Sequence, residues 1–330
     1  MPAESVSPED LPPLELSKLR DLDIHRREGD ERGPYIYAAS AVVRRADFTY
    51  VIGDDELDLA VFQLSTGEPG DLRRVLPGEM PVDLDERKKE KADLEALTEL
   101  PPFDGAPYGG LLGLGSGSKE NRGRGFFWQL APDGSLVGEP QPIDLDPLYD
   151  ALRAEINGLN IEGAAVLGER FALFHRGNAE DSQNAIAELA LDRVFDSVTG
   201  DHKFDPGELE RITEYDLGEL DGVRLAFSDA TGLSDDLVVF TASAEGGGSS
   251  YDDGSIHGSV VGTVDPGGGV RRLRTIDRKW KVEGVHATLD TGVIDFVFVC
   301  DQDSDDEPSP LLSATMPIDG GVEAAVQDDH

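Results

Sequence analysis

The chain has 330 residues, of which 67 are acidic and 29 are basic, giving a formal net charge of −38. A nucleic-acid backbone is bound by clustered positive charge, so this composition disfavours a nucleic-acid partner. No run of about 18 apolar residues occurs, so we expect no membrane-spanning helix.

Glycine, proline and cysteine usage narrows the fold class and the compartment. The 38 Gly and 20 Pro residues favour many short strands joined by turns, as in an all-β fold. The single Cys300 has no partner for an intrachain disulfide, and the first residues lack the basic region and apolar core of a secretory signal. We therefore expect a cytoplasmic protein with an acidic surface, for which a high-salt cytoplasm is one explanation.

A repeat of roughly 55 to 67 residues organises the chain, in the range of one β-propeller blade with extended loops. Each copy starts with a Ser, or with a Glu followed by Gly or Ala. The five starts are Ser40 in AASAVV, Glu95 in ADLEALT, Glu162 in LNIEGAAV, Ser228 in LAFSDAT and Glu283 in KVEGVHA. We therefore predict one domain over residues 1–330, an all-β, five-bladed β-propeller with blades beginning near residues 40, 93, 160, 226 and 281.

In chain order, LPPLELSKLRDLDI is expected to supply a strand that closes the ring with the last blade. Every repeat then continues with a second, apolar strand. These strands are TYVIG (49–53), LLGLG (111–115), RFALF (170–174), LVVF (237–240) and IDFVFVC (294–300). A third strand returns, so four strands per blade are expected. Leu84 to Leu97 and Pro147 to Ile156 have helical spacing and are expected as inserts on the propeller rim.

The second strands end in polar residues. These polar tips are Asp54-Asp55, Ser116 to Lys119, His175-Arg176, Ser243 to Glu245 and Asp301 to Asp303.

The repeat register also places one side chain per blade at the axis. Three carboxylates in a narrow tunnel repel one another, and they either take up protons or bind a cation. Oxygen ligands without Cys or His suit Ca²⁺ better than Zn²⁺. The sequence therefore predicts Ca²⁺ at the axis; the alternative is that the Glu side chains cap backbone amides at the tunnel mouth. The predicted ligands are Ser40, Glu95, Glu162, Ser228 and Glu283.

The order Ser, Glu, Glu, Ser, Glu resembles that of the five-bladed apyrases, the calcium-activated nucleotidases, in which one such side chain per blade surrounds a central Ca²⁺. TYVIGDDELDLAVFQL is similar to that family's strand ending in an Asp-Asp pair, GLGSGSKENRG to its Gly-Leu-Gly-Lys segment, and ALFHRGNA to its Arg-bearing strand end. The chain is also similar to uncharacterised bacterial propellers grouped with phytase-like or esterase-like proteins. The apyrase resemblance implies a calcium-dependent hydrolase of nucleotides or other small phosphoesters.

The same resemblance implies catalytic roles. Asp54 or Asp55 would accept a proton from the attacking water, and Arg176 would stabilise the phosphate charge of the transition state. Basic and polar tip residues would contact the substrate, which is expected to be a small anionic molecule. The predicted substrate contacts are Lys119, Arg122, Arg124, His175 and Glu245.

Two other functions fit these residues. The apyrases carry a basic, Gly-rich segment before the first ligand, whereas Gly33 to Tyr37 contains no cation. A non-catalytic propeller with a structural calcium ion and a polar face for a ligand or partner is therefore an alternative. A calcium-assisted esterase or lactonase is another, because the same ion polarises a carbonyl.

Overall fold

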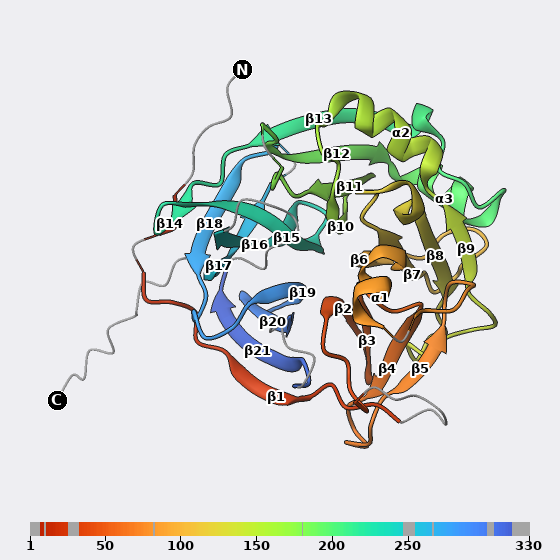
Figure 1. The fold of residues 1–330 in the computed structure, drawn as a ribbon, viewed down its shortest axis with the longest axis horizontal. Helices are drawn as coiled ribbons and strands as arrows, with labels where there is room; N and C mark the ends of the chain where they lie inside the picture. Colours follow the sequence, from red (N-terminus) through yellow and green to blue (C-terminus); the bar gives the residue numbers. More distant parts are fainter. Residues whose placement is uncertain are drawn as a thin grey trace.

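The computed structural model describes residues 7–9, 11–25, 33–81, 83–179, 181–246, 255–265, 267–301 and 307–318. In this part of the chain, five antiparallel sheets are arranged in a ring (Figure 1). The predicted all-β, five-bladed propeller is therefore confirmed. None of the helices in the described ranges has the length and apolar character needed to cross a membrane.

The first three blades each contain four strands in chain order from the axis outward. Blade 1 consists of β2 (Ala39–Arg45), β3 (Phe48–Gly53), β4 (Asp58–Gln63) and β5 (Asp71–Arg74). Blade 2 consists of β6 (Leu94–Leu100), β7 (Gly110–Gly115), β8 (Arg124–Gln129) and β9 (Gln141–Asp144). Blade 3 consists of β10 (Ile161–Leu167), β11 (Arg170–His175), β12 (Asn184–Ala190) and β13 (Leu209–Tyr215).

The last two blades depart from this pattern. Blade 4 has an additional short strand, and the outer strand of blade 5 comes from the N-terminal segment, in the order β19-β20-β21-β1. Blade 4 consists of β14 (Glu219–Leu220), β15 (Val223–Ser234), β16 (Leu237–Gly246), β17 (Ser255–Val264) and β18 (Val270–Thr275). Blade 5 consists of β19 (Val282–Asp290), β20 (Val293–Cys300), β21 (Pro310–Pro317) and β1 (Ser17–Asp21).

The inner strands close the ring. β2 packs against β6, β6 against β10, β10 against β15, β15 against β19, and β19 again against β2. Alternating side chains of these strands face the two neighbouring blades, as the two-residue period of a strand requires. Five apolar clusters result, each between two adjacent blades. Cys300 is buried in the cluster between blades 4 and 5.

Three α-helices and two short 3-10 helices connect the described strands. They are α1 (Leu84–Glu90), α2 (Asp146–Glu155), α3 (Leu191–Thr199), η1 (Glu120–Arg122) and η2 (Pro206–Glu208). Figure 1 shows α2 and α3 at the outer edge of the ring, where both pack into the cluster between blades 2 and 3. The predicted helix over residues 147–156 is confirmed by α2.

Two helix predictions need correction. The helical spacing predicts a helix from Leu84 to Leu97, but α1 ends at Glu90. Asp93 has a left-handed φ of 57°, and Leu94–Leu100 is the inner strand of blade 2. Figure 1 also shows α1 near the middle of the ring rather than on the rim. The sequence reading missed α3, whose Leu191, Val194 and Val198 are buried at helical spacing in a segment of nine residues.

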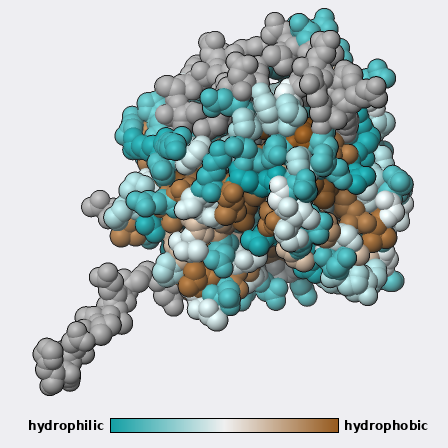
Figure 2. All heavy atoms as spheres, turned by 90° about the horizontal axis from the view of Figure 1, so that it is seen from below, coloured by the Kyte–Doolittle hydropathy of each residue, from teal (hydrophilic) through white to brown (hydrophobic). Residues whose placement is uncertain are grey.

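One face of the molecule is polar over much of its area (Figure 2). Figure 2 shows hydrophilic side chains spread over the face in view, with smaller apolar areas between them.

Candidate functional site

The five predicted axial residues occupy one structural position. In every blade, the pairing between the inner strand and the second strand skips one residue of the inner strand. Such a β-bulge redirects a side chain and is frequent beside functional sites. The skipped residues are Ser40, Glu95, Glu162, Ser228 and Glu283.

Close approach of neighbouring inner strands explains the glycine that follows Glu162 and the one that follows Glu283. A Cβ atom on Gly163 would lie 2.5 Å from the backbone nitrogen of Ala230, and one on Gly284 would lie 2.8 Å from the Cα of Ala41. A side chain at either position would collide with backbone of the next blade. Glycine therefore follows Glu162 and Glu283 because the backbones of neighbouring blades lie too close together at the axis for a side chain.

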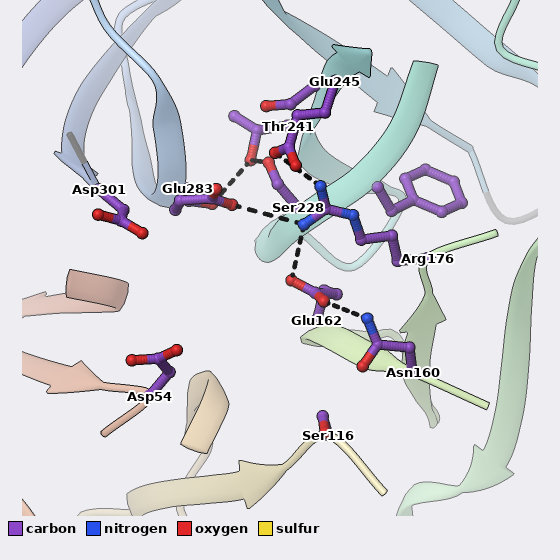
Figure 3. A network of polar contacts seen from close by, with 12 residues as sticks. Asp54, Ser116, Asn160, Glu162, Arg176, Ser228, Thr241, Glu245, Glu283 and Asp301 are labelled. Atoms are coloured by element: carbon purple, nitrogen blue, oxygen red, sulfur yellow. Dashed lines mark hydrogen bonds and ion pairs between the residues drawn. The ribbon is translucent and has the colours of Figure 1, made fainter. Parts of the chain in front are cut away.

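The ends of the second strands surround the same space. Asp54, Ser116, Arg176 and Asp301 directly follow β3, β7, β11 and β20, and Glu245 lies near the end of β16. In Figure 3 the side chains of Asp54, Ser116 and Asp301 surround a common space with those of Glu162 and Glu283. The structure therefore brings the bulged residues and the strand tips together at one end of the axis.

Arg176 and Lys281 are the basic side chains on one side of this space. One Nη atom of Arg176 lies 2.6 Å from Glu245, whereas the other lies 3.4 Å from Glu162 and 4.0 Å from Glu283. The Nζ atom of Lys281 lies 3.3 Å from Glu283, 3.7 Å from Asp301 and 3.9 Å from Glu245. The bulged glutamates thus have looser ion pairs than Glu245.

Asp93 is the centre of a second group of charges, on the opposite side. Its carboxylate lies 2.7 Å from both Lys91 and Arg122, and it accepts a hydrogen bond from the Ser116 hydroxyl. Lys91 also pairs with Asp54. The left-handed backbone of the buried Asp93 is a rare conformation for a residue with a side chain, and such conformations concentrate at functional sites.

Glu95 is the least neutralised carboxylate of the site. Its ligand atom lies within 4.8 Å of those of Asp54 and Asp93, so the three carboxylates form a group that could hold a metal ion. No basic side chain in that part of the chain lies within 4.0 Å of it. Burial, together with the charges of Glu162, Asp93 and Asp54, raises the pKa of Glu95 well above its ordinary value.

The pKa values of the other two bulged glutamates shift in the same direction. Burial raises the pKa of Glu162, although Arg176 opposes the change. Burial and the neighbouring carboxylates raise the pKa of Glu283 to about 7, against the opposing effect of Lys281. The ring as a whole carries an excess of three negative charges when every group is ionised. Its carboxylates are Asp54, Asp93, Glu95, Glu162, Glu245, Glu283 and Asp301, and its cations are Lys91, Arg122, Arg176 and Lys281.

These features fit a hard divalent cation. The donor atoms are oxygens, the excess charge is negative, and the bulged glutamates have either loose ion pairs or none in the described chain. Ser40 is buried on β2, and the Ser228 hydroxyl donates to Thr241 at 3.0 Å. The hydroxyl oxygen of Ser228 can still accept, so its role as a ligand stays a prediction.

The two residues of the Asp-Asp pair have different surroundings. The side chain of Asp54 is 23% exposed and faces the axial space in Figure 3. Asp55 turns towards α1, where it lies 2.8 Å from Arg87 and accepts a hydrogen bond of 2.5 Å from the Tyr37 hydroxyl. The structure therefore separates a carboxylate at the axial space from one held in an interior ion pair.

The predicted substrate contacts are dispersed. Lys119 is exposed in the loop after β7, Arg124 lies at the start of β8, and Arg122 binds Asp93. His175 is fully buried, with one ring nitrogen near the backbone nitrogen of Asn160 and the other 3.0 Å from Ser182. Burial lowers its pKa to about 4, so it is neutral, and its position gives no support to a substrate contact.

Three charged residues of the site were missed by the sequence reading, namely Lys91, Asp93 and Lys281. Asp301 was identified as part of a polar strand tip, but no role was predicted for it. A signal for Asp93 and Lys281 existed, because each bulged Glu is preceded by a polar residue two positions earlier. These residues are Asp93, Asn160 and Lys281. Asn160 donates a hydrogen bond of 2.5 Å to Glu162, so this position supports the bulged carboxylate directly.

Comparison with known proteins identifies the family. A sequence model described as "Family of unknown function (DUF6929)" matches residues 35–316. The chain belongs to this family. A search of curated proteins found no match.

Solved structures agree on the fold. The α-L-arabinofuranosidase PaAbf62A of Podospora anserina, in complex with cellotriose, aligns with a TM-score of 0.52 at 11% identity, covering 94% of this chain and 100% of that chain. The catalytic domain of an α-L-arabinofuranosidase of Coprinopsis cinerea aligns with a TM-score of 0.51 at 10% identity, covering 92% and 98%. At these identities the likeness concerns the fold alone.

Proposed function

We propose that this protein is a calcium-dependent hydrolase whose site is the axial ring. The observation that carries the proposal is the contrast between tight and loose ion pairs. Asp93 and Glu245 lie 2.6–2.7 Å from basic nitrogens, whereas the closest such distances for Glu162 and Glu283 are 3.4 and 3.3 Å. The negative charges of Glu162 and Glu283 are therefore less neutralised by basic side chains, and an added cation can bind them.

Calcium is the cation that this donor set suits. Glu95, Glu162 and Glu283 would hold it, with hydroxyl oxygens of Ser40 and Ser228 as further ligands. Ca²⁺ accepts several oxygen ligands in an irregular geometry, which suits side chains from five different strands. When bound there, it would supply Lewis-acid polarisation of a substrate oxygen.

Asp54 is the proton acceptor that we propose. It faces the axial space, and burial raises its pKa while Lys91 opposes the shift. A carboxylate with a raised pKa is a better base than an exposed one. Lys91 holds this side chain in place through its second contact with Asp93. Asp55, held by Arg87 and Tyr37, is better suited to fixing the strand end.

For the substrate we propose a nucleotide or another small phosphoester. The support is the resemblance of the axial residues and strand tips to those of the apyrases, together with the basic residues at the tips. The test is phosphate release from nucleoside di- and triphosphates and simple phosphoesters, in Ca²⁺ and in chelator, at low and high salt. We expect release that requires Ca²⁺ and is abolished in Glu162→Gln. A matched control, Glu188→Gln, changes a buried carboxylate of blade 3 that binds Arg170 and Arg211 far from the axis and should retain the calcium dependence.

One observation favours a calcium-assisted esterase or lactonase as a second candidate. The guanidinium of Arg176 already contacts Glu162, Glu245 and Glu283, so it is poorly placed to receive an added phosphate. A neutral ester would need no such cation. Calcium-dependent hydrolysis of aryl esters or lactones without phosphate release would support this candidate. Binding of calcium without hydrolysis of either class would support a non-catalytic propeller.

A further inference from the structure

We propose that Arg176 and Lys281 are internal counter-ions that compete with a divalent cation for the bulged carboxylates and thereby set the cation affinity of the axial site. This inference rests on the proposed function, because it requires that the ring binds a cation. It gives Arg176 a role different from a phosphate contact.

The guanidinium of Arg176 makes one short ion pair and two longer ones. One Nη atom is fixed by Glu245 at 2.6 Å, and the other lies 3.4 Å from Glu162 and 4.0 Å from Glu283. Figure 3 shows the guanidinium between these carboxylates. A cation that binds Glu162 and Glu283 therefore displaces only the loose contacts, and Glu245 keeps the side chain in place.

Lys281 repeats this arrangement from blade 5. Its ammonium lies 3.3 Å from Glu283, 3.7 Å from Asp301 and 3.9 Å from Glu245, so it is shared among three carboxylates. A flexible ammonium group can move towards Asp301 or Glu245 when Glu283 binds another cation. Both basic side chains therefore keep a carboxylate partner when an added cation binds the bulged glutamates. This partner is Glu245 for Arg176, and Asp301 or Glu245 for Lys281.

The positive charges of Arg176 and Lys281 stabilise the cation-free protein and destabilise the cation-bound protein. Without a cation, they partly neutralise buried carboxylates that would otherwise be uncompensated, which is strongly destabilising. With a divalent ion present, each positive charge a few ångströms away lowers the affinity, on the order of tenfold even with the screening of bulk water. Arg176 and Lys281 therefore keep the cation-free propeller folded and weaken cation binding.

The test is calorimetric titration of Ca²⁺ into the full chain at fixed ionic strength. The variants are Lys281→Gln, Arg176→Gln and the charge-preserving Arg176→Lys. The matched control is Arg211→Gln, which removes one positive charge from a contact with Glu188 on the outer side of blade 3. We expect Lys281→Gln and Arg176→Gln to bind Ca²⁺ about tenfold more tightly than the wild type. Arg176→Lys and Arg211→Gln should match the wild type.

The outcomes separate this inference from the proposed function. If the wild type binds Ca²⁺ and the neutral variants bind it equally or more weakly, the counter-ion role is wrong and the calcium site stands. If neither wild type nor variants bind, both are wrong. If only the neutral variants bind, the counter-ion role is supported and the calcium dependence of the wild type is refuted. Should Arg176→Gln fail to fold in chelator, Lys281→Gln alone decides between these outcomes.

Discussion

Replacement of Glu283 by Gln should stabilise the cation-free protein at alkaline pH. Burial raises the pKa of this carboxyl to about 7, whereas an unfolded chain has the ordinary value of 4.5. Between these two values the native state holds a proton that the unfolded state has released, so stability falls as pH rises. Above pH 7 the full loss amounts to about 3 kcal/mol, because one pKa unit corresponds to about 1.4 kcal/mol.

The assay is urea unfolding in chelator at pH 5 and pH 8. At pH 8 Glu283→Gln should exceed the wild type by about 3 kcal/mol, and at pH 5 the difference should be small. Glu188→Gln is the control of opposite sign, because that buried carboxylate has close contacts with Arg170 and Arg211 and the substitution removes both ion pairs.

Added Ca²⁺ should then reverse the order of stability at pH 8. The wild type gains the free energy of cation binding, while Glu283→Gln has lost a ligand. If Glu283→Gln were less stable than the wild type at pH 8 in chelator, the carboxylate would already be balanced by Arg176 and Lys281. The axial ring would then carry no uncompensated negative charge at Glu283, contrary to our prediction.

Three further predictions concern the surroundings of the site. Asp54→Asn should abolish calcium-dependent hydrolysis, whereas Asp55→Asn should chiefly lower the melting temperature, and retained activity in the first would exclude Asp54 as the base. Arg87→Ala should lower the free energy of unfolding by about 3–5 kcal/mol, because it removes a buried guanidinium that contacts the carboxylates of both Asp55 and Glu56. Chemical denaturation measures this, and a change below about 1 kcal/mol would contradict it. Leu22→Ala, at a fully buried position between blades 5 and 1, should cost about 2–5 kcal/mol in the same experiment, and a negligible cost would show that ring closure there does not depend on this contact.

Much of the architecture was predictable because the blades repeat locally. Each repeat encodes its own strand order, and the Glu-Gly pairs identify the residue that bulges where neighbouring inner strands meet. Local repetition therefore indicated both the ring and the five equivalent positions.

The charge network was less predictable because its partners come from different blades. Arg176 of blade 3 contacts Glu245 of blade 4 and Glu283 of blade 5, and no local pattern encodes such a pairing. The end of α1 was missed for a related reason. Charged residues continue at helical spacing up to Glu95, but the left-handed Asp93 and the pairing of β6 with β7 end the helix at Glu90.

We propose that a divalent cation binds among the carboxylates of Glu95, Glu162 and Glu283 at the axis. The most direct measurement is an anomalous difference map from crystals of the full chain grown with Ca²⁺, compared with crystals of Glu162→Gln. We predict one strong peak bounded by Glu95, Glu162 and Glu283 in the wild type, and its loss in the variant. A wild-type map without a peak there, with Arg176 still between Glu162 and Glu283, would contradict the claim.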